Sequence, residues 1–182
     1  MPDTQTFLSV AETLARRAGD LCLEIQQDLG EIHYKSKKDV VTRADIASEK
    51  LIVEGIRKAF PTHSIRTEEA GVIEGTDPRY LWIIDPVDGT VNFSRGIPLW
   101  GISIALHFEG KPLVAAVNLP KLGELYTASL GGGAFMNGKA IHVSRESDSV
   151  HAIVSNGDFN VGDAQKINEQ NSRNFAREAV AF

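Results

Sequence analysis

Two aspartates, Asp85 and Asp88, follow a short apolar run and precede a glycine and a threonine. The run, residues 82–84, predicts a buried strand that ends at Pro86. Because unpaired buried charge is costly, acids at the end of a buried strand indicate a bound cation. Carboxylates, water and a backbone carbonyl such as that of Val87 are the ligands that magnesium takes, so the residue types favour Mg²⁺.

A third carboxylate, Glu68, follows another predicted strand at residues 64–67. Three carboxylates are enough to hold two ions roughly 4 Å apart, which would activate a water, bridge a phosphate and stabilise a leaving oxygen. Gly89 lets the backbone approach an anion. If a helix begins at about Thr90, its free N–H groups would receive phosphate oxygens. The chemistry that this spacing suggests is phosphoryl transfer to water.

Thr90 is a candidate for orienting the attacking water, with Asp45 accepting a hydrogen bond from it. Both assignments have plainer alternatives. Asp45 begins a predicted helix, where the helix dipole favours an acid, as it also would for Glu49. The string Asp-Pro-x-Asp-Gly-Thr is itself typical of a type I turn. From these residues alone, a tight turn and a metal site both remain open.

The periodicity of apolar residues predicts the elements that must position these groups. Spacings of three and four predict amphipathic helices over residues 7–25 and 44–60, and Pro61 ends the second. Apolar runs predict strands at residues 64–67, 99–108, 112–117 and 124–129. The second and third of these strands form a predicted hairpin with a short polar tip.

The glycine-rich segment 130–139 at first resembles a phosphate-binding loop. It lacks the Gly-Lys-Ser/Thr ending of a P-loop, and no helical pattern follows it. Asn137-Gly138 between two short apolar stretches predicts a type I′ hairpin instead.

Composition limits the classes of protein that remain. Of 182 residues, 42% are hydrophobic and 24% charged, which is typical of a globular protein. The net charge of −5, with no basic block, argues against a direct nucleic-acid surface. A lone cysteine, Cys22, allows no intrachain disulfide, and the histidines lack the spacing of a zinc site. With no apolar run of membrane-spanning length and no signal peptide, we expect a cytoplasmic protein without a membrane partner.

The end of the chain predicts a second unit. Residues 151–155 have the pattern of a strand, and residues 163–182 show a weak helical pattern with no later strand to pack against. We therefore expect an α+β domain at 1–147 that binds metal and phosphate, and at 148–182 the start of an incomplete C-terminal α/β domain.

Residues 82–93, Trp-Ile-Ile-Asp-Pro-Val-Asp-Gly-Thr-Val-Asn-Phe, closely resemble the first signature of the inositol monophosphatase family of lithium-sensitive, magnesium-dependent phosphatases. Residues 39–45, 60–69, 96–98 and 133–138 resemble its other landmarks. The resemblance implies the layered α-β-α-β-α sugar phosphatase fold, usually as a homodimer. The family's second signature, Trp-Asp-x-Ala-Ala-Gly, has no counterpart, so we expect a complete N-terminal part and a truncated C-terminal part.

The resemblance also implies roles for individual residues. Glu68, Asp85 and Asp88 would ligate Mg²⁺ together with the Val87 carbonyl. The backbone of Gly89 and Thr90, with Val87 and Asp88 beside them, would bind the substrate phosphate. Thr90 with Asp45 would activate the attacking water. Where many relatives have glycine before this glutamate, the chain has Thr67, which we expect to change only the conformation of a loop.

The implied function is hydrolysis of a small polyol phosphate, with inositol 1-phosphate first. Relatives with the same chemistry act on histidinol phosphate, fructose 1,6-bisphosphate or nucleotide 3′-phosphates, and the first signature does not separate these substrates. A non-catalytic interaction protein is the alternative of another class, because some bacterial relatives have regulatory roles linked to RNA synthesis. A folded but inactive chain that lacks one metal ligand is a third possibility.

Overall fold

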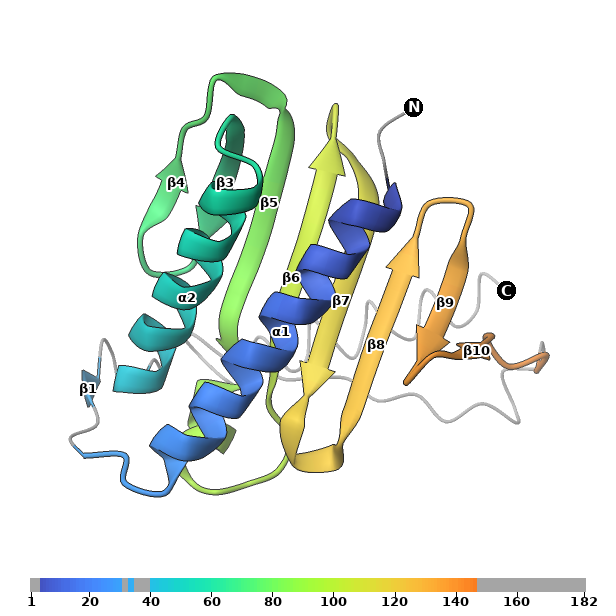
Figure 1. Cartoon of the computed structure of the whole chain (residues 1–182). Helices are drawn as coiled ribbons and strands as arrows, with labels where there is room; N and C mark the ends of the chain where they lie inside the picture. Colours follow the sequence, from blue (N-terminus) through green and yellow to red (C-terminus); the bar gives the residue numbers. More distant parts are fainter. Residues whose placement is uncertain (1–3, 31–32, 35–39, 147–182) are drawn as a thin grey trace, which may run out of the picture. The chain divides into compact units, whose positions relative to one another are not determined.

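An eight-stranded mixed sheet with two long helices on one face forms the first part of the chain (Figure 1). The computed structural model describes residues 4–30, 33–34 and 40–146. The chain divides into two compact units, Met1–Ile141 and His142–Phe182, and the sheet belongs to the first. The predicted strand at 151–155 and helix at 163–182 lie outside the described residues, and the predicted domain boundary near residue 147 stays a prediction.

The two helices are α1, Thr4–Gln26, and α2, Arg43–Ala59, and both confirm the predicted amphipathic patterns. Helix α1 packs on β6, β7 and β8, whereas α2 packs on β5 and β3. The helices also contact each other at Gly55, where a Cβ would lie 2.3 Å from Leu14 Cδ2. In the part of the chain that the structure describes, no helix is long and apolar enough to cross a membrane.

The sheet has the order β10-β9-β8-β7-β6-β5-β3-β4. Strands β3 and β5 are parallel, and each of the other neighbouring pairs is antiparallel. The strands are β3 His63–Thr67, β4 Gly71–Ile73, β5 Asp77–Asp88, β6 Gly101–Phe108, β7 Lys111–Leu119, β8 Glu124–Ser129, β9 Gly133–Met136 and β10 Lys139–Ile141. Smaller elements are the paired strands β1 His33–Tyr34 and β2 Val40–Val41, helix α3 Thr90–Ser94 and the 3-10 helix η1 Pro120–Leu122.

Both predicted hairpins are confirmed. Strands β6 and β7 pair around a turn in which Glu109 and Gly110 have φ values of 51° and 78°. Asn137 and Gly138 have φ values of 48° and 77° and join β9 to β10. Positive φ at both central residues is the requirement of a type I′ turn, and Asn-Gly is the dipeptide that meets it most readily.

Strand β5 corrects the prediction that the buried strand ends at Pro86. The strand continues to Asp88, and its register with β6 shifts between Asp85, opposite Ser103, and Asp88, opposite Gly101. Three steps on β5 thus match two steps on β6, which is a β-bulge. Proline has no N–H to donate to the ladder, so pairing is interrupted there and resumes after one extra residue.

The core lies between the helices and the sheet. Along β6 the buried residues alternate, as expected for a strand with one face against helices. They join the buried residues of β5 and of both helices in one apolar cluster; its fully buried members include Ala11, Ala18, Ile52, Ile56, Trp82, Ile102, Ile104 and Leu106. This cluster fixes the end of β5 against the start of α2, where the candidate site residues lie.

Candidate active site at the end of strand β5

The first turn of α2 is built around Asp45. Thr42 caps the helix and donates twice to Asp45 Oδ2, from its backbone N–H at 2.8 Å and from its hydroxyl at 2.7 Å. The Thr42 hydroxyl in turn accepts from the N–H of Ala44 at 3.1 Å. Thr42 and Asp45 also form a capping box, in which the side chain of each accepts from the backbone N–H of the other. Burial raises the pKa of Asp45, which is 1% exposed, and hydrogen bonds from Thr42 and Thr90 oppose that rise.

Thr90, the first residue of α3, connects this turn to the end of β5. Its Oγ1 lies 3.0 Å from Asp45 Oδ1 and 2.9 Å from the Val87 carbonyl oxygen. The predicted hydrogen bond between Thr90 and Asp45 is therefore present. A hydroxyl has one proton and two lone pairs, so Thr90 can donate a hydrogen bond to Asp45 while its oxygen accepts a hydrogen bond from water.

Asp85 lies in the bulge of β5 and is half-buried. Its Oδ1 accepts a hydrogen bond from the Val87 N–H at 3.2 Å. Burial raises the pKa of Asp85 to about 7, and the negative charges of Glu68, Asp88 and Asp45 add to the rise. Carboxylates that disfavour one another's ionisation in this way create a site that a cation would stabilise.

The sheet register brings Glu68 to the same edge. Thr67, the last residue of β3, lies opposite Ile84 on the parallel strand β5, so Glu68 and Asp85 come next along the two neighbouring strands. Glu68 and Asp88 are exposed. Within the described residues, no group of three acidic, histidine or cysteine side chains is close enough to hold a metal ion as it stands. The donors are all oxygen and suit Mg²⁺, but the described residues supply only part of a closed coordination shell.

Gly89 occupies a position that only glycine fills without strain. Its φ is 88°, and a Cβ there would lie 3.0 Å from the Leu99 carbonyl oxygen and 3.4 Å from Trp100 Cα. Gly89 is the N-cap of α3, which confirms the predicted helix start at Thr90. Val87, also predicted to contact phosphate, already uses its N–H toward Asp85 and its carbonyl toward Thr90.

Sequence reasoning missed two residues of α2. The Ser48 hydroxyl donates to the Pro86 carbonyl at 2.8 Å, which fixes the bulge of β5. Glu49 Oε2 accepts from the Thr67 hydroxyl and from the Glu69 N–H. Thr67 thus makes a specific contact, beyond the change of loop conformation expected for it.

The spacing of polar residues in the sequence could have indicated Ser48 and Glu49. Positions 45, 48 and 49 share one helical face, and three polar residues there interrupt an apolar pattern. Glu49 was expected to serve the helix dipole, but Asp45 is the acid of the first turn and Glu49 lies beyond it. The polar face of α2 therefore forms hydrogen bonds to three segments: the start of α3, the bulge of β5, and the turn after β3.

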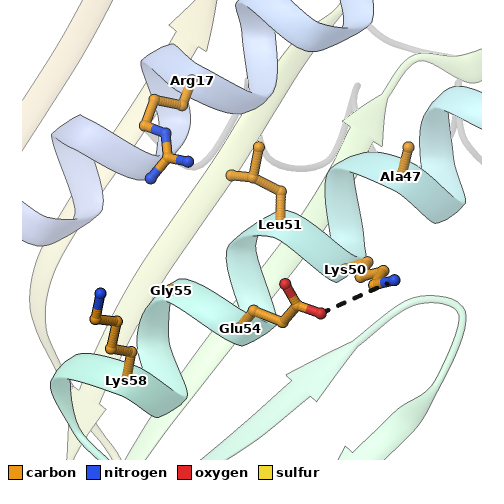
Figure 2. Close-up of a pocket in the computed structure, with 7 residues that line it drawn as sticks. All are labelled: Arg17, Ala47, Lys50, Leu51, Glu54, Gly55 and Lys58. Atoms are coloured by element: carbon orange, nitrogen blue, oxygen red, sulfur yellow. Dashed lines mark ion pairs between the residues drawn. The ribbon is translucent and has the colours of Figure 1, made fainter.

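A groove of about 460 Å³ lies elsewhere, between α1 and α2 (Figure 2). It contains an ion pair between Lys50 and Glu54, with 4.0 Å between the charged atoms. The residues that line it are Arg17, Ala47, Lys50, Leu51, Glu54, Gly55 and Lys58. None of these is a predicted site residue.

Comparison with known proteins identifies relatives along the chain. The model of the inositol monophosphatase family matches residues 3–179. Nus factor SuhB of Pseudomonas aeruginosa is 41% identical over 180 residues, which cover 97% of this chain and 66% of that protein. The chain thus spans less than two-thirds of this relative's length.

Solved structures support the same assignment. The inositol monophosphatase from Anabaena superposes with a TM-score of 0.69 at 38% identity, over 79% of this chain and 52% of its own. An IMPase/NADP phosphatase complexed with Mg²⁺ and phosphate superposes with a TM-score of 0.68 at 26% identity, over 75% of this chain and 52% of its own. The fold is therefore the layered α/β fold that the sequence predicted. By its sequence and by this architecture, the chain belongs to the inositol monophosphatase family.

Proposed function

We propose that the protein is a magnesium-dependent phosphate monoester hydrolase that acts on a small polyol phosphate, with inositol 1-phosphate as its preferred substrate. The observation that carries this proposal is the hydrogen bond between Thr90 and Asp45, directly beside the acids at the end of β5. A hydroxyl backed by a buried carboxylate is a group that can orient water and take up its proton. Family membership supports the reaction class.

In this proposal, Glu68, Asp85 and Asp88 hold Mg²⁺ together with the Val87 carbonyl. When bound, Mg²⁺ neutralises phosphate charge and makes water a stronger nucleophile. The relative that is complexed with Mg²⁺ and phosphate supports this choice of metal. The donor set supports it too, because its ligands are all oxygen.

The other roles belong to the chain's own groups. Thr90 orients the attacking water, and Asp45 holds the proton that Thr90 donates. The backbone of Gly89 and Thr90, at the start of α3, binds phosphate oxygens, with Val87 and Asp88 beside them. The close approach that Gly89 allows supports this placement, because no side chain stands between backbone and anion.

A panel of phosphate monoesters tests the proposal. Purified protein is incubated with Mg²⁺ and inositol 1-phosphate, histidinol phosphate, fructose 1,6-bisphosphate or a nucleotide 3′-phosphate, and released phosphate is measured. We expect the highest kcat/KM for inositol 1-phosphate. Faster turnover of another member would change the substrate and keep the reaction class. No release from any member by folded protein would contradict the enzyme proposal.

A second candidate function is that of a non-catalytic interaction protein. It is favoured by the name of the Pseudomonas aeruginosa relative, Nus factor SuhB. This candidate predicts a folded protein that releases no phosphate from the panel. A cytoplasmic location and a homodimer remain predictions, and sedimentation equilibrium would measure the second.

A further inference from the structure

We propose that Glu49 is a positioning residue of the candidate metal site, because its buried carboxylate holds the turn that carries Glu68. The inference deepens the proposed function and rests on it. Glu49 does not itself belong to the predicted set of ligands. Its task is to fix the backbone on both sides of one member of that set.

The contacts of Glu49 converge on a single oxygen. Oε2 accepts a hydrogen bond from the Thr67 hydroxyl and another, at 3.0 Å, from the backbone N–H of Glu69. These two donors belong to the residues immediately before and after Glu68. Since Glu49 is 8% exposed, water competes little for these bonds. The carboxylate thus restrains the backbone of Glu68 from both neighbours.

The restraint matters because Glu68 lies where regular structure ends. Thr67 is the last residue of β3, and β4 begins at Gly71 after a three-residue turn. The exposed glutamate would otherwise lose backbone freedom at the moment of metal binding, which weakens affinity. Residues that orient a metal ligand typically contribute 10–100-fold to metal affinity.

The neighbours of Glu49 on α2 support a positioning role. Asp45 holds the start of α3 through Thr90, and Ser48 holds the bulge of β5 through the Pro86 carbonyl. Glu49 adds the third segment, which the sheet register already places beside the end of β5. One rigid helical face thereby sets the relative positions of all the predicted metal ligands.

Mg²⁺ binding measured by isothermal titration calorimetry tests the inference without relying on turnover. Glu49→Ala removes both hydrogen bonds, and we expect its Kd for Mg²⁺ to rise about 10-fold or more. Glu49→Gln keeps a carbonyl oxygen that can accept from both donors, so it should recover most of the affinity. Thr67→Val removes one bond and should fall between these two. Glu54→Gln, on the same helix and exposed, is the matched control and should bind like wild type.

Hydrogen exchange provides a second readout. In Glu49→Ala the amide of Glu69 should exchange at least about 10-fold faster, while amides in the core of β6 keep their protection. A folded Glu49→Ala protein with wild-type Mg²⁺ affinity would overturn the inference. If that variant does not fold, Thr67→Val decides, and unchanged Mg²⁺ affinity in it would have the same meaning.

The outcomes separate this inference from the proposed function. Wild-type protein that binds Mg²⁺ and releases phosphate, beside a Glu49→Ala protein that binds Mg²⁺ equally well, would remove the inference alone. Wild-type protein that binds no Mg²⁺ would remove both.

Discussion

Thr90 Oγ1 lies 3.0 Å from Asp45 Oδ1, and this bond joins two residues that are 45 positions apart in sequence, in the first turns of α2 and α3. Three further hydrogen bonds, which join Thr42, Asp45 and Ala44, fix the Asp45 carboxylate, and the Val87 carbonyl lies 2.9 Å from Thr90 Oγ1 as a second acceptor for the same hydroxyl proton. The pair is therefore held in place before any ligand arrives, which is how a general-base assembly gains its effect.

Replacing the threonine tests this pair. Thr90→Val keeps the shape of the side chain but removes the hydroxyl, so kcat for phosphate release should fall by about 10²–10⁴-fold. Thr90→Ser restores the hydroxyl and should recover most of the rate. Steady-state kinetics with inositol 1-phosphate at saturating Mg²⁺ measures both. A Thr90→Val rate equal to wild type would show that the hydroxyl has no part in catalysis.

Gly89 and Gly110 form a matched pair for testing the close approach at the start of α3. Both have positive φ, 88° and 78°, but a Cβ meets the Leu99 carbonyl at 3.0 Å only at Gly89; nothing described lies within 4 Å at Gly110. Gly110→Ala should cost about 1–2 kcal/mol of unfolding free energy from φ alone. Gly89→Ala should cost more and weaken phosphate binding as well. Urea denaturation measures the unfolding free energy of both variants. Equal losses of unfolding free energy at Gly89 and Gly110 would contradict the proposed close contact at Gly89.

The Ser48 hydroxyl satisfies a buried carbonyl. Ser48→Ala leaves the Pro86 oxygen without this donor and should lower the unfolding free energy by about 1–3 kcal/mol. Ser94→Ala serves as the control, because its hydroxyl forms an exposed hydrogen bond to the Val91 carbonyl within the same short helix. Its loss should be a few tenths of a kcal/mol at most. Similar losses in the two variants would mean that the bond to Pro86 does not stabilise the bulge.

His63 makes stability depend on pH. Burial lowers its pKa, and the nearby charge of Asp77 only partly opposes this. Its Nδ1 accepts the Trp82 indole N–H at 3.1 Å, and its ring stacks on Tyr80 with 4.2 Å between centroids. The neutral form is thus favoured in the folded state, so the unfolded chain binds the proton first as pH falls below about 6.5.

Stability due to this histidine should be fully present above pH 6.5 and lost as pH falls from there toward the lowered pKa. Urea denaturation at pH 7.5 and 5.5 measures the loss. We expect a smaller difference between the two pH values in His63→Gln than in the wild type. An unchanged pH dependence in His63→Gln would contradict this assignment.

Much of the fold follows from local signals in the sequence. The apolar spacing of both long helices, Pro61 after the second, and the Asn137-Gly138 turn each specify one conformation with little help from distant residues. The end of β5 did not follow, because a proline after an apolar run predicts a strand end. Pairing with β6 on both sides of the bulge overrides that local preference.

For the candidate site too, the sequence indicates some residues and not others. Asp85 stands out because an acid is unusual at the end of a buried apolar strand, whereas Asp45 and Thr90 are candidates at helix starts, where such residues are common. Ser48 and Glu49 gain their roles only through contacts with segments 38 and 20 residues away, and no local pattern specifies those partners. Residue types and spacing thus give candidates for ligand binding, whereas the partners of Ser48 and Glu49 are specified only by the three-dimensional fold.

The most direct test of the proposed mechanism is Mg²⁺-dependent release of phosphate from inositol 1-phosphate by wild-type protein and by Asp85→Asn. The variant keeps the size of the side chain but removes the charge in the bulge of β5, so we predict loss of at least about 10²-fold in kcat/KM together with loss of Mg²⁺ binding. Asp28→Asn, whose side chain is 91% exposed, should behave like wild type. Release by Asp85→Asn at the wild-type rate, or wild-type release that persists after Mg²⁺ is removed with EDTA, would exclude a Mg²⁺-dependent mechanism at Asp85.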